Sequence, residues 1–170
     1  RAAGYQAFPV IVSTRANGAL QSFFPDDAQF NHVLAYVKLD EGYILMDAVS
    51  EGYGPDMLPW HDLNTGSQGM LISSSGYEWI PLAPKYTGKH NCNATLKLSA
   101  DGTLSGKLSF MEKGYSGASA RIAYMEVDED PRKCAMDYFI DTENEIEVTE
   151  IEVYGEKEIT APFKMKFQME

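Results

Sequence analysis

Cysteine is scarce in this sequence, with Cys92 and Cys134 the only two among 170 residues. Neither has a second cysteine at the short spacing of a structural zinc motif, which argues against a zinc site. Two cysteines far apart leave two alternatives open, one disulfide or two free thiols. Neither is expected to be essential for folding, because a module of about 85 residues with several alternating strands can build its own core.

Long apolar runs and an excess of positive charge are also missing. No stretch approaches the ~18 consecutive apolar residues that a membrane-spanning helix needs, so we expect no membrane span. Asp and Glu outnumber Lys and Arg by 25 to 14, which gives a net charge of −11. Such an acidic surface repels phosphate backbones, so nucleic-acid binding is not expected.

The sequence also has no initiator methionine and no signal peptide, since it begins with RAAGYQAFPV. This start is typical of a segment from the middle of a longer protein. Any targeting signal is then expected upstream of Arg1, and its absence here carries no information about localisation.

What the sequence does contain is a pattern of short β-strands. Apolar residues make up 44% of the chain, enough for a packed core. In the first half, short apolar runs alternate with turn signals, which is typical of strands and hairpins. The expected strands are QAFPVIVSTR (6–15), HVLAYVKL (32–39), YILMDAV (43–49) and the hairpin GMLISSSGYEWIPL (69–82).

The second half also alternates, but it contains one helix signal. NCNATLKLS and TLSGKLSFME flank the turn ADG and predict a hairpin. Asp130 and Pro131 have the residue types of an N-cap and a first helical position, so a helix of about ten residues is expected from Pro131. EIEVTEIEVYG and PFKMKFQME predict strands with one charged, solvent-facing side.

The character of the sequence changes around Pro84, and a boundary is expected between Leu82 and Lys85. We therefore expect two domains, residues 1–83 and 84–170. The predicted fold class is α+β, with mostly antiparallel β-strands and one short helix in the second domain.

One predicted hairpin carries a histidine and an aspartate at its open end. His32 begins the run HVLAYVKL, and Asp47 follows the return run YILM. With Asp40–Glu41 as a two-residue loop, the two residues are diagonal neighbours on one face, with backbones about 7 Å apart. A Glu41–Gly42 loop would separate them by about 13 Å, and a three-residue loop would place them on opposite faces. The sequence leaves these registers open.

In the first register, this pair has the residue types for acid–base chemistry. A carboxylate such as that of Asp47 can hold the His32 imidazole in one tautomer and stabilise its charged form. The imidazole can then deprotonate a nucleophilic thiol. The alternative interpretation is structural, with His32 a half-buried strand residue and Asp47 a cap at the end of a strand.

The segment from Gly4 to Leu82 resembles bacterial transglutaminase-like domains, of the papain-like cysteine class. The matching pieces are RAAGYQAFPVIVSTR, QFNHVLAYV, LMDAV, LPWHDLN and EWIPL, and the region after Pro84 resembles the β-rich C-terminal module that follows such domains. His32 and Asp47 match the family's catalytic His and Asp. RAAGY matches the tail of the helix whose start carries the family's nucleophilic cysteine.

This resemblance implies a cysteine protease, amidase or acyltransferase that acts on a peptide or isopeptide substrate. It also implies a large multidomain parent protein in the periplasm or outside the cell. No cofactor and no metal is expected.

Two positions depart from the family pattern. Val49 stands where many relatives have Thr after Asp-Ala, and no cysteine precedes His32. Cys92 and Cys134 follow Asp47, in the wrong order for the family. The nucleophile is therefore expected upstream of Arg1, and this chain alone is expected to be inactive.

Other polar and aromatic residues point less clearly to a function. His61 and His90 have no metal-ligand spacing with each other or with His32, and both are expected in polar loops. Several aromatic residues could line a groove near His32, and an aromatic groove also fits a non-catalytic binding module, including one for glycans. These residues are Tyr5, Phe23, Phe24, Tyr36, Tyr43 and Tyr53. Trp60 and Trp79 could line a cleft or serve packing.

Overall fold

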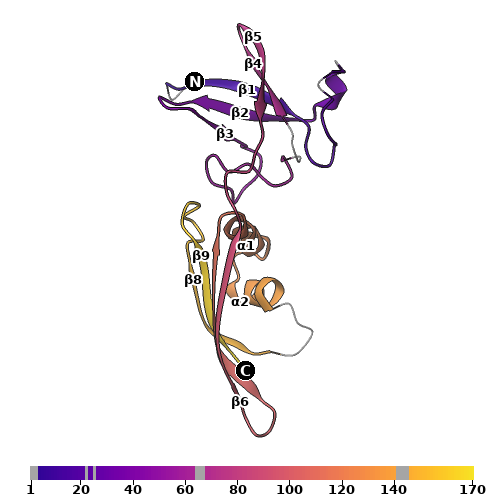
Figure 1. The fold of residues 1–170 in the computed structure, drawn as a ribbon. Helices are drawn as coiled ribbons and strands as arrows, with labels where there is room; N and C mark the ends of the chain where they lie inside the picture. The colour runs from indigo at the N-terminus through magenta and orange to yellow at the C-terminus, as the bar shows by residue number, and fades with distance from the viewer. Residues whose placement is uncertain (1–3, 22, 25, 64–67, 141–145) are drawn as a thin grey trace. The chain divides into compact units, whose positions relative to one another are not determined.

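The computed structural model describes residues 4–21, 23–24, 26–63, 68–140 and 146–170. Its contacts divide the chain into two compact units, Arg1–Lys85 and Tyr86–Glu170, and each contains one β-sheet (Figure 1). All strand pairings in these two sheets are antiparallel. The predicted class, α+β with mostly antiparallel β, is therefore confirmed.

The first unit folds as a five-stranded sheet in the order β3-β2-β1-β4-β5. Val10, Val12 and Leu34 are at most 1% exposed on one face of this sheet. Val12 pairs directly with His32 in the ladder, and directly paired residues point to the same side. His32 therefore belongs to the buried face. The elements are β1 (Gln6–Val12), a 3-10 helix (Asp27–Gln29), β2 (His32–Lys38), β3 (Tyr43–Met46), β4 (Gln68–Ser73) and β5 (Gly76–Pro81).

The β2–β3 hairpin has the register predicted for an Asp40–Glu41 loop. The Leu39 amide donates a hydrogen bond to the Gly42 carbonyl at 3.1 Å, and the ladder keeps this register through β3. Gly42 has a φ of 80°, in the left-handed region that favours glycine. This register makes His32 and Asp47 diagonal neighbours on one face.

The second unit is a four-stranded sheet in the order β6-β7-β9-β8, with helices packed against it. Phe110 of β7 and Phe163 and Phe167 of β9 are at most 5% exposed. Together with apolar helix residues they form a core between the helices and the sheet. The elements are β6 (Lys89–Leu98), β7 (Leu104–Lys113), α1 (Tyr115–Glu126), α2 (Pro131–Cys134), the π-helix η2 (Ala135–Ile140), β8 (Val148–Tyr154) and β9 (Phe163–Met169).

The helix predicted from Pro131 is present, and Asp130 caps it as expected. The Asp130 carboxylate accepts a hydrogen bond from the Arg132 amide at 2.9 Å. One α-helical turn ends at Cys134, and the π-helix η2 continues it.

Helix α1 is an addition to the single short helix that the sequence predicted. Its start, GYSGASA, contains two glycines, which have low helix propensity and weaken a helix signal in the sequence. The small residues serve close packing instead, because a Cβ at Gly117 would lie 3.0 Å from the carbonyl oxygen of Glu112. The expectation of one helix is therefore corrected, because the described residues of this unit include α1 as well as the helix that starts at Pro131.

The stretch RAAGY was expected to be the tail of a helix. Its first three residues lie outside the described residues, which begin at Gly4. Among the residues that the structure describes, no helix is long and apolar enough to span a membrane.

Candidate functional site

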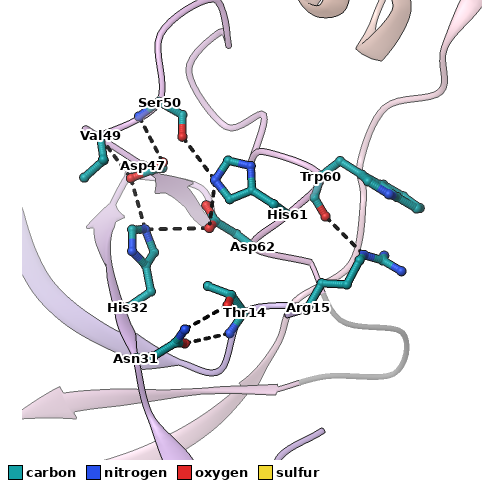
Figure 2. Close-up of polar contacts among 10 residues, drawn as sticks. All are labelled: Thr14, Arg15, Asn31, His32, Asp47, Val49, Ser50, Trp60, His61 and Asp62. Carbon is teal, nitrogen blue, oxygen red and sulfur yellow. Dashed lines mark hydrogen bonds and ion pairs between the residues drawn. The ribbon is translucent and has the colours of Figure 1, made fainter. Parts of the chain in front are cut away.

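The open end of the β2–β3 hairpin brings His32 and Asp47 into contact. His32 Nε2 lies 3.3 Å from Asp47 Oδ1, at the centre of the polar cluster in Figure 2. The two side chains are 19% and 1% exposed, respectively. The prediction that a ring nitrogen of His32 meets a carboxylate oxygen of Asp47 is confirmed.

Asp47 is also held by the backbone that follows it. The Val49 amide donates to Oδ1 at 3.0 Å, and the Ser50 amide donates to Oδ2 at 3.2 Å. Burial alone would raise the pKa of Asp47, but the hydrogen bonds from Val49 and Ser50 and the charge of His32 outweigh burial and lower it. Asp47 is therefore ionised at neutral pH, and the same carboxylate caps the strand end and contacts the imidazole.

Asn31, the residue before His32, fixes the start of β2. Its amide donates to the Val12 carbonyl at 3.1 Å. Its side chain accepts a hydrogen bond from the Thr14 amide and donates one to the Thr14 hydroxyl, both at 2.9 Å. These hydrogen bonds join the residue before β2 to the end of β1 and to the residues that follow it. They fix the backbone position of the adjacent His32.

A second carboxylate, Asp62, lies in this site, and the sequence pattern predicted no role for it. Asp62 comes from the loop before β4 and is 0% exposed. Its Oδ1 lies 3.7 Å from His32 Nε2 and 3.5 Å from His61 Nε2. Neither carboxylate oxygen of Asp62 has a hydrogen-bond partner among the described residues.

The environment of Asp62 opposes its ionisation. Burial raises the pKa of Asp62 and the negative charge of Asp47 adds to this, while His32 and His61 pull in the opposite direction without cancelling it. Two carboxylates near one imidazole thus have pKa values shifted in opposite directions, which is common where acid and base roles are divided.

His61 lies at the exposed rim of the site and is not an isolated loop residue. Its side chain is 61% exposed, and its Nε2 lies 3.3 Å from the Ser50 hydroxyl. Its backbone carbonyl accepts a hydrogen bond from the Arg15 amide at 2.9 Å. Figure 2 shows this ring facing Asp62, on the side away from His32.

His90 is on strand β6 in the second unit, so the expectation of a loop position is wrong. Its Nδ1 contacts Oε1 of Glu112, a carboxylate that is 1% exposed in its side chain. Burial raises the pKa of Glu112, and His90 opposes that rise. His90 and Glu112 thus form a second histidine–carboxylate contact, separate from the one around His32.

Both cysteines are free thiols, which decides between the two alternatives left by the sequence. Both belong to the second unit, whereas His32 belongs to the first. Cys134 is buried, and burial together with the charge of Asp137 raises its pKa to about 11. A thiol with so high a pKa is protonated at neutral pH and is a poor nucleophile.

Aromatic residues lie on both faces of the first sheet, and Tyr36 and Tyr43 share the face of His32. Tyr36 and Tyr43 stack on the hairpin with ring centroids 4.7 Å apart. Trp79 and Phe30 stack 6.4 Å apart in a pocket of ≈ 370 Å³ that includes Ile11. Because side chains alternate along β1, this pocket is on the opposite face of the sheet from Val12 and His32.

Comparison of the chain with protein-family models, curated proteins and solved structures found no match. What the site can do is therefore inferred from its own geometry, above all from His32, Asp47 and Asp62.

Proposed function

We propose that His32 and Asp47 are the acid–base pair of a transglutaminase-like cysteine hydrolase or acyltransferase that acts on peptide or isopeptide amides. The observation that carries this proposal is the 3.3 Å contact between His32 Nε2 and Asp47 Oδ1 at the open end of one hairpin. The sequence pieces that resemble the family support it independently, since they assign the same two residues to the same roles.

The contact defines which ring nitrogen would do the chemistry. An ionised Asp47 carboxylate can only accept hydrogen bonds. His32 Nε2 therefore carries the ring proton and donates a hydrogen bond to the carboxylate. Nδ1 then has the free lone pair and can accept a proton from a thiol. The negative charge of Asp47 stabilises the imidazolium that forms.

The expected reaction has two halves. The thiolate attacks the amide carbon, the amine leaves with the proton held at His32 Nδ1, and a thioester remains on the sulfur. Water or a second amine then attacks the thioester while Nδ1 takes up its proton, and the thiol is released. Water gives hydrolysis, and an amine gives transfer.

The nucleophilic thiol is the part that the His32 unit does not contain. Cys134 is buried and protonated, and both cysteines follow Asp47 in the sequence. We place the nucleophile in a segment encoded before Arg1. The 170 residues alone would then have no thiol-dependent activity.

The test begins with the coding sequence before the Arg1 codon, where the proposal requires a cysteine. The full gene product is then assayed for hydrolysis of peptide amides and isopeptides, with and without thiol alkylation. His32→Gln and Asp47→Asn should lower kcat by roughly 10²–10⁴-fold, the usual contribution of a general base. His90→Gln is the matched control, since it removes a histidine that contacts a buried carboxylate in the second unit.

A non-catalytic binding module is the second candidate, and one observation favours it. The pocket on the opposite face combines stacked Phe30 and Trp79 with acidic and amide side chains, a combination suited to sugar rings. The same assay separates the two candidates. An upstream sequence without cysteine, or no thiol-dependent hydrolysis by the full gene product, would discard the enzyme and leave the binding module. Full activity in His32→Gln would remove the catalytic role proposed for His32.

A further inference from the structure

Asp62 is in an unusual position for a carboxylate. It is fully buried, both of its oxygens lack a hydrogen-bond partner among the described residues, and its two imidazole neighbours are beyond hydrogen-bond distance. Burying an unpaired polar group costs about 1–3 kcal/mol, and more when the group is charged. The Asp62 oxygens are therefore available to bind a ligand on the side that faces the His32 ring (Figure 2).

The three polar atoms around this point have the spacing of a metal site. His32 Nε2, Asp47 Oδ1 and a carboxylate oxygen of Asp62 all lie within 4.8 Å of one another. The His32 nitrogen is 3.3 Å from the Asp47 oxygen and 3.7 Å from the Asp62 oxygen. Metal–ligand bonds of ~2.0–2.2 Å in a tetrahedron place ligand atoms about 3.3–3.6 Å apart. The two separations from the His32 nitrogen therefore need little adjustment, and the two carboxylate oxygens are at most 4.8 Å apart.

We propose that His32 Nε2, Asp47 Oδ1 and Asp62 Oδ1 bind a divalent cation of the zinc class. One imidazole and two carboxylates form a mixed nitrogen and oxygen set, which suits Zn²⁺ and its transition-metal neighbours. Calcium takes six to eight oxygen ligands, and magnesium prefers oxygen in octahedral geometry, so neither fits this set. The charge of the cation would balance the two carboxylates.

Access to the site also fits a cation from solvent. His32 is 19% exposed in its side chain, so one side of the cluster is open to water. His61 Nε2 is 3.5 Å from the same Asp62 oxygen and borders the opening. With three protein ligands, a fourth position remains for water, as in zinc sites that are not closed by protein.

This inference does not rest on the proposed function, but it has a consequence for it. A cation on Nε2 leaves the ring proton on Nδ1, since a neutral imidazole carries only one. His32 with bound metal could then not accept a proton from a thiol. Zinc binding and acid–base chemistry at His32 would exclude each other.

The test is calorimetric titration of the 170-residue chain with ZnCl₂, after chelator has removed any bound metal. Wild type should bind one Zn²⁺ per chain and should bind Ca²⁺ and Mg²⁺ far more weakly. Asp62→Asn and His32→Gln should each weaken zinc binding by at least the roughly 10–100-fold that loss of an outer-shell partner costs. His90→Gln is again the matched control and should leave the affinity unchanged.

Several results would overturn the site. They are the absence of saturable zinc binding, equal affinity in Asp62→Asn and His32→Gln, an equal loss in His90→Gln, or a preference for calcium. Circular dichroism checks that each variant is folded, and either ligand variant decides the question if the other does not fold. Because the chain is assayed without any thiol reaction, failure here leaves the proposed function standing, and failure of the enzyme assay leaves the zinc result standing.

Discussion

At the scale of single residues, Asp47 and Asp62 have the same side chain, but their surroundings shift the two pKa values in opposite directions. Asp47 receives backbone hydrogen bonds from Val49 and Ser50, which stabilise its charged form. Asp62 receives none among the described residues, and burial favours its neutral form. His32 Nε2 lies near both carboxylates, 3.3 Å from Asp47 and 3.7 Å from Asp62. The pKa of Asp47 is lowered and that of Asp62 is raised.

We expect Asp62→Asn to raise the free energy of unfolding at neutral pH in metal-free buffer by roughly 1–3 kcal/mol, because it removes an unpaired buried charge. The pKa of Asp62 is raised, so the folded state keeps this proton to higher pH than the unfolded chain. Protonated Asp62 therefore contributes its full stabilisation of the fold below the ordinary pKa of 3.8. This contribution is lost as pH rises through the folded-state pKa. Urea unfolding at a series of pH values should show the advantage of the variant growing with pH.

Asp47→Asn should behave in the opposite way. The pKa of Asp47 is lowered, so its charged form stabilises the fold above the ordinary pKa of 3.8, and this is lost as pH falls through the folded-state pKa. The variant should lose about 1 kcal/mol at neutral pH and approach wild type in acid. If both variants destabilise the chain equally at neutral pH, the difference between the two carboxylates is refuted.

At the scale of elements, local pattern predicted that the β2–β3 hairpin exists but left its register open. Alternation of apolar residues fixed which side chains share a face, and the Asp40–Glu41–Gly42 run limited the loop to a few registers. Only the structure chose among them, because the choice depends on Gly42 adopting a left-handed φ. The contact between His32 and Asp47 followed from that choice.

Two features, helix α1 and the burial of Asp62, could not be predicted from the local sequence pattern. The start of helix α1 contains glycines, which have low helix propensity, and Gly117 is explained by its close approach to the backbone of Glu112. Asp62 lies in a loop distant in sequence from His32, and a loop path is set by tertiary contacts. Its neighbour His61 was noticed in the sequence, but nothing there indicated that Asp62 would be buried.

The junction between β7 and α1 provides a test at this scale. Gly114 has a φ of 57°, and a Cβ there would lie 3.0 Å from the carbonyl carbon of Thr87 and still closer to its oxygen. Gly114→Ala should therefore combine a left-handed backbone, roughly 1–2 kcal/mol, with a steric clash. Gly102→Ala isolates the first effect, because Gly102 has a φ of 93° and open space around it. Thermal unfolding should show a clearly larger loss for Gly114→Ala, and equal losses would contradict the close packing at α1.

At the scale of the whole molecule, chemistry is distributed unevenly between the two units. The first unit holds His32, Asp47 and Asp62, and the second holds both cysteines. The net charge of −11 would attract cations toward the site and repel acidic substrates. The proposed acid–base pair and the proposed metal site thus use the same residues of the first unit, and both depend on the direction in which the His32 ring presents its nitrogens.

The most direct measurement is therefore the tautomer of His32 in the full chain, read from the ¹⁵N chemical shifts of its ring by NMR. The spectra are recorded in metal-free buffer at mildly alkaline pH, where an imidazole is neutral, and His32→Gln assigns the signals. We predict a proton on Nε2 and a free Nδ1 in wild type, and a mixture of tautomers in Asp47→Asn. A proton on Nδ1 in wild type, or an unchanged ratio in Asp47→Asn, would contradict the pairing of His32 with Asp47 for acid–base chemistry.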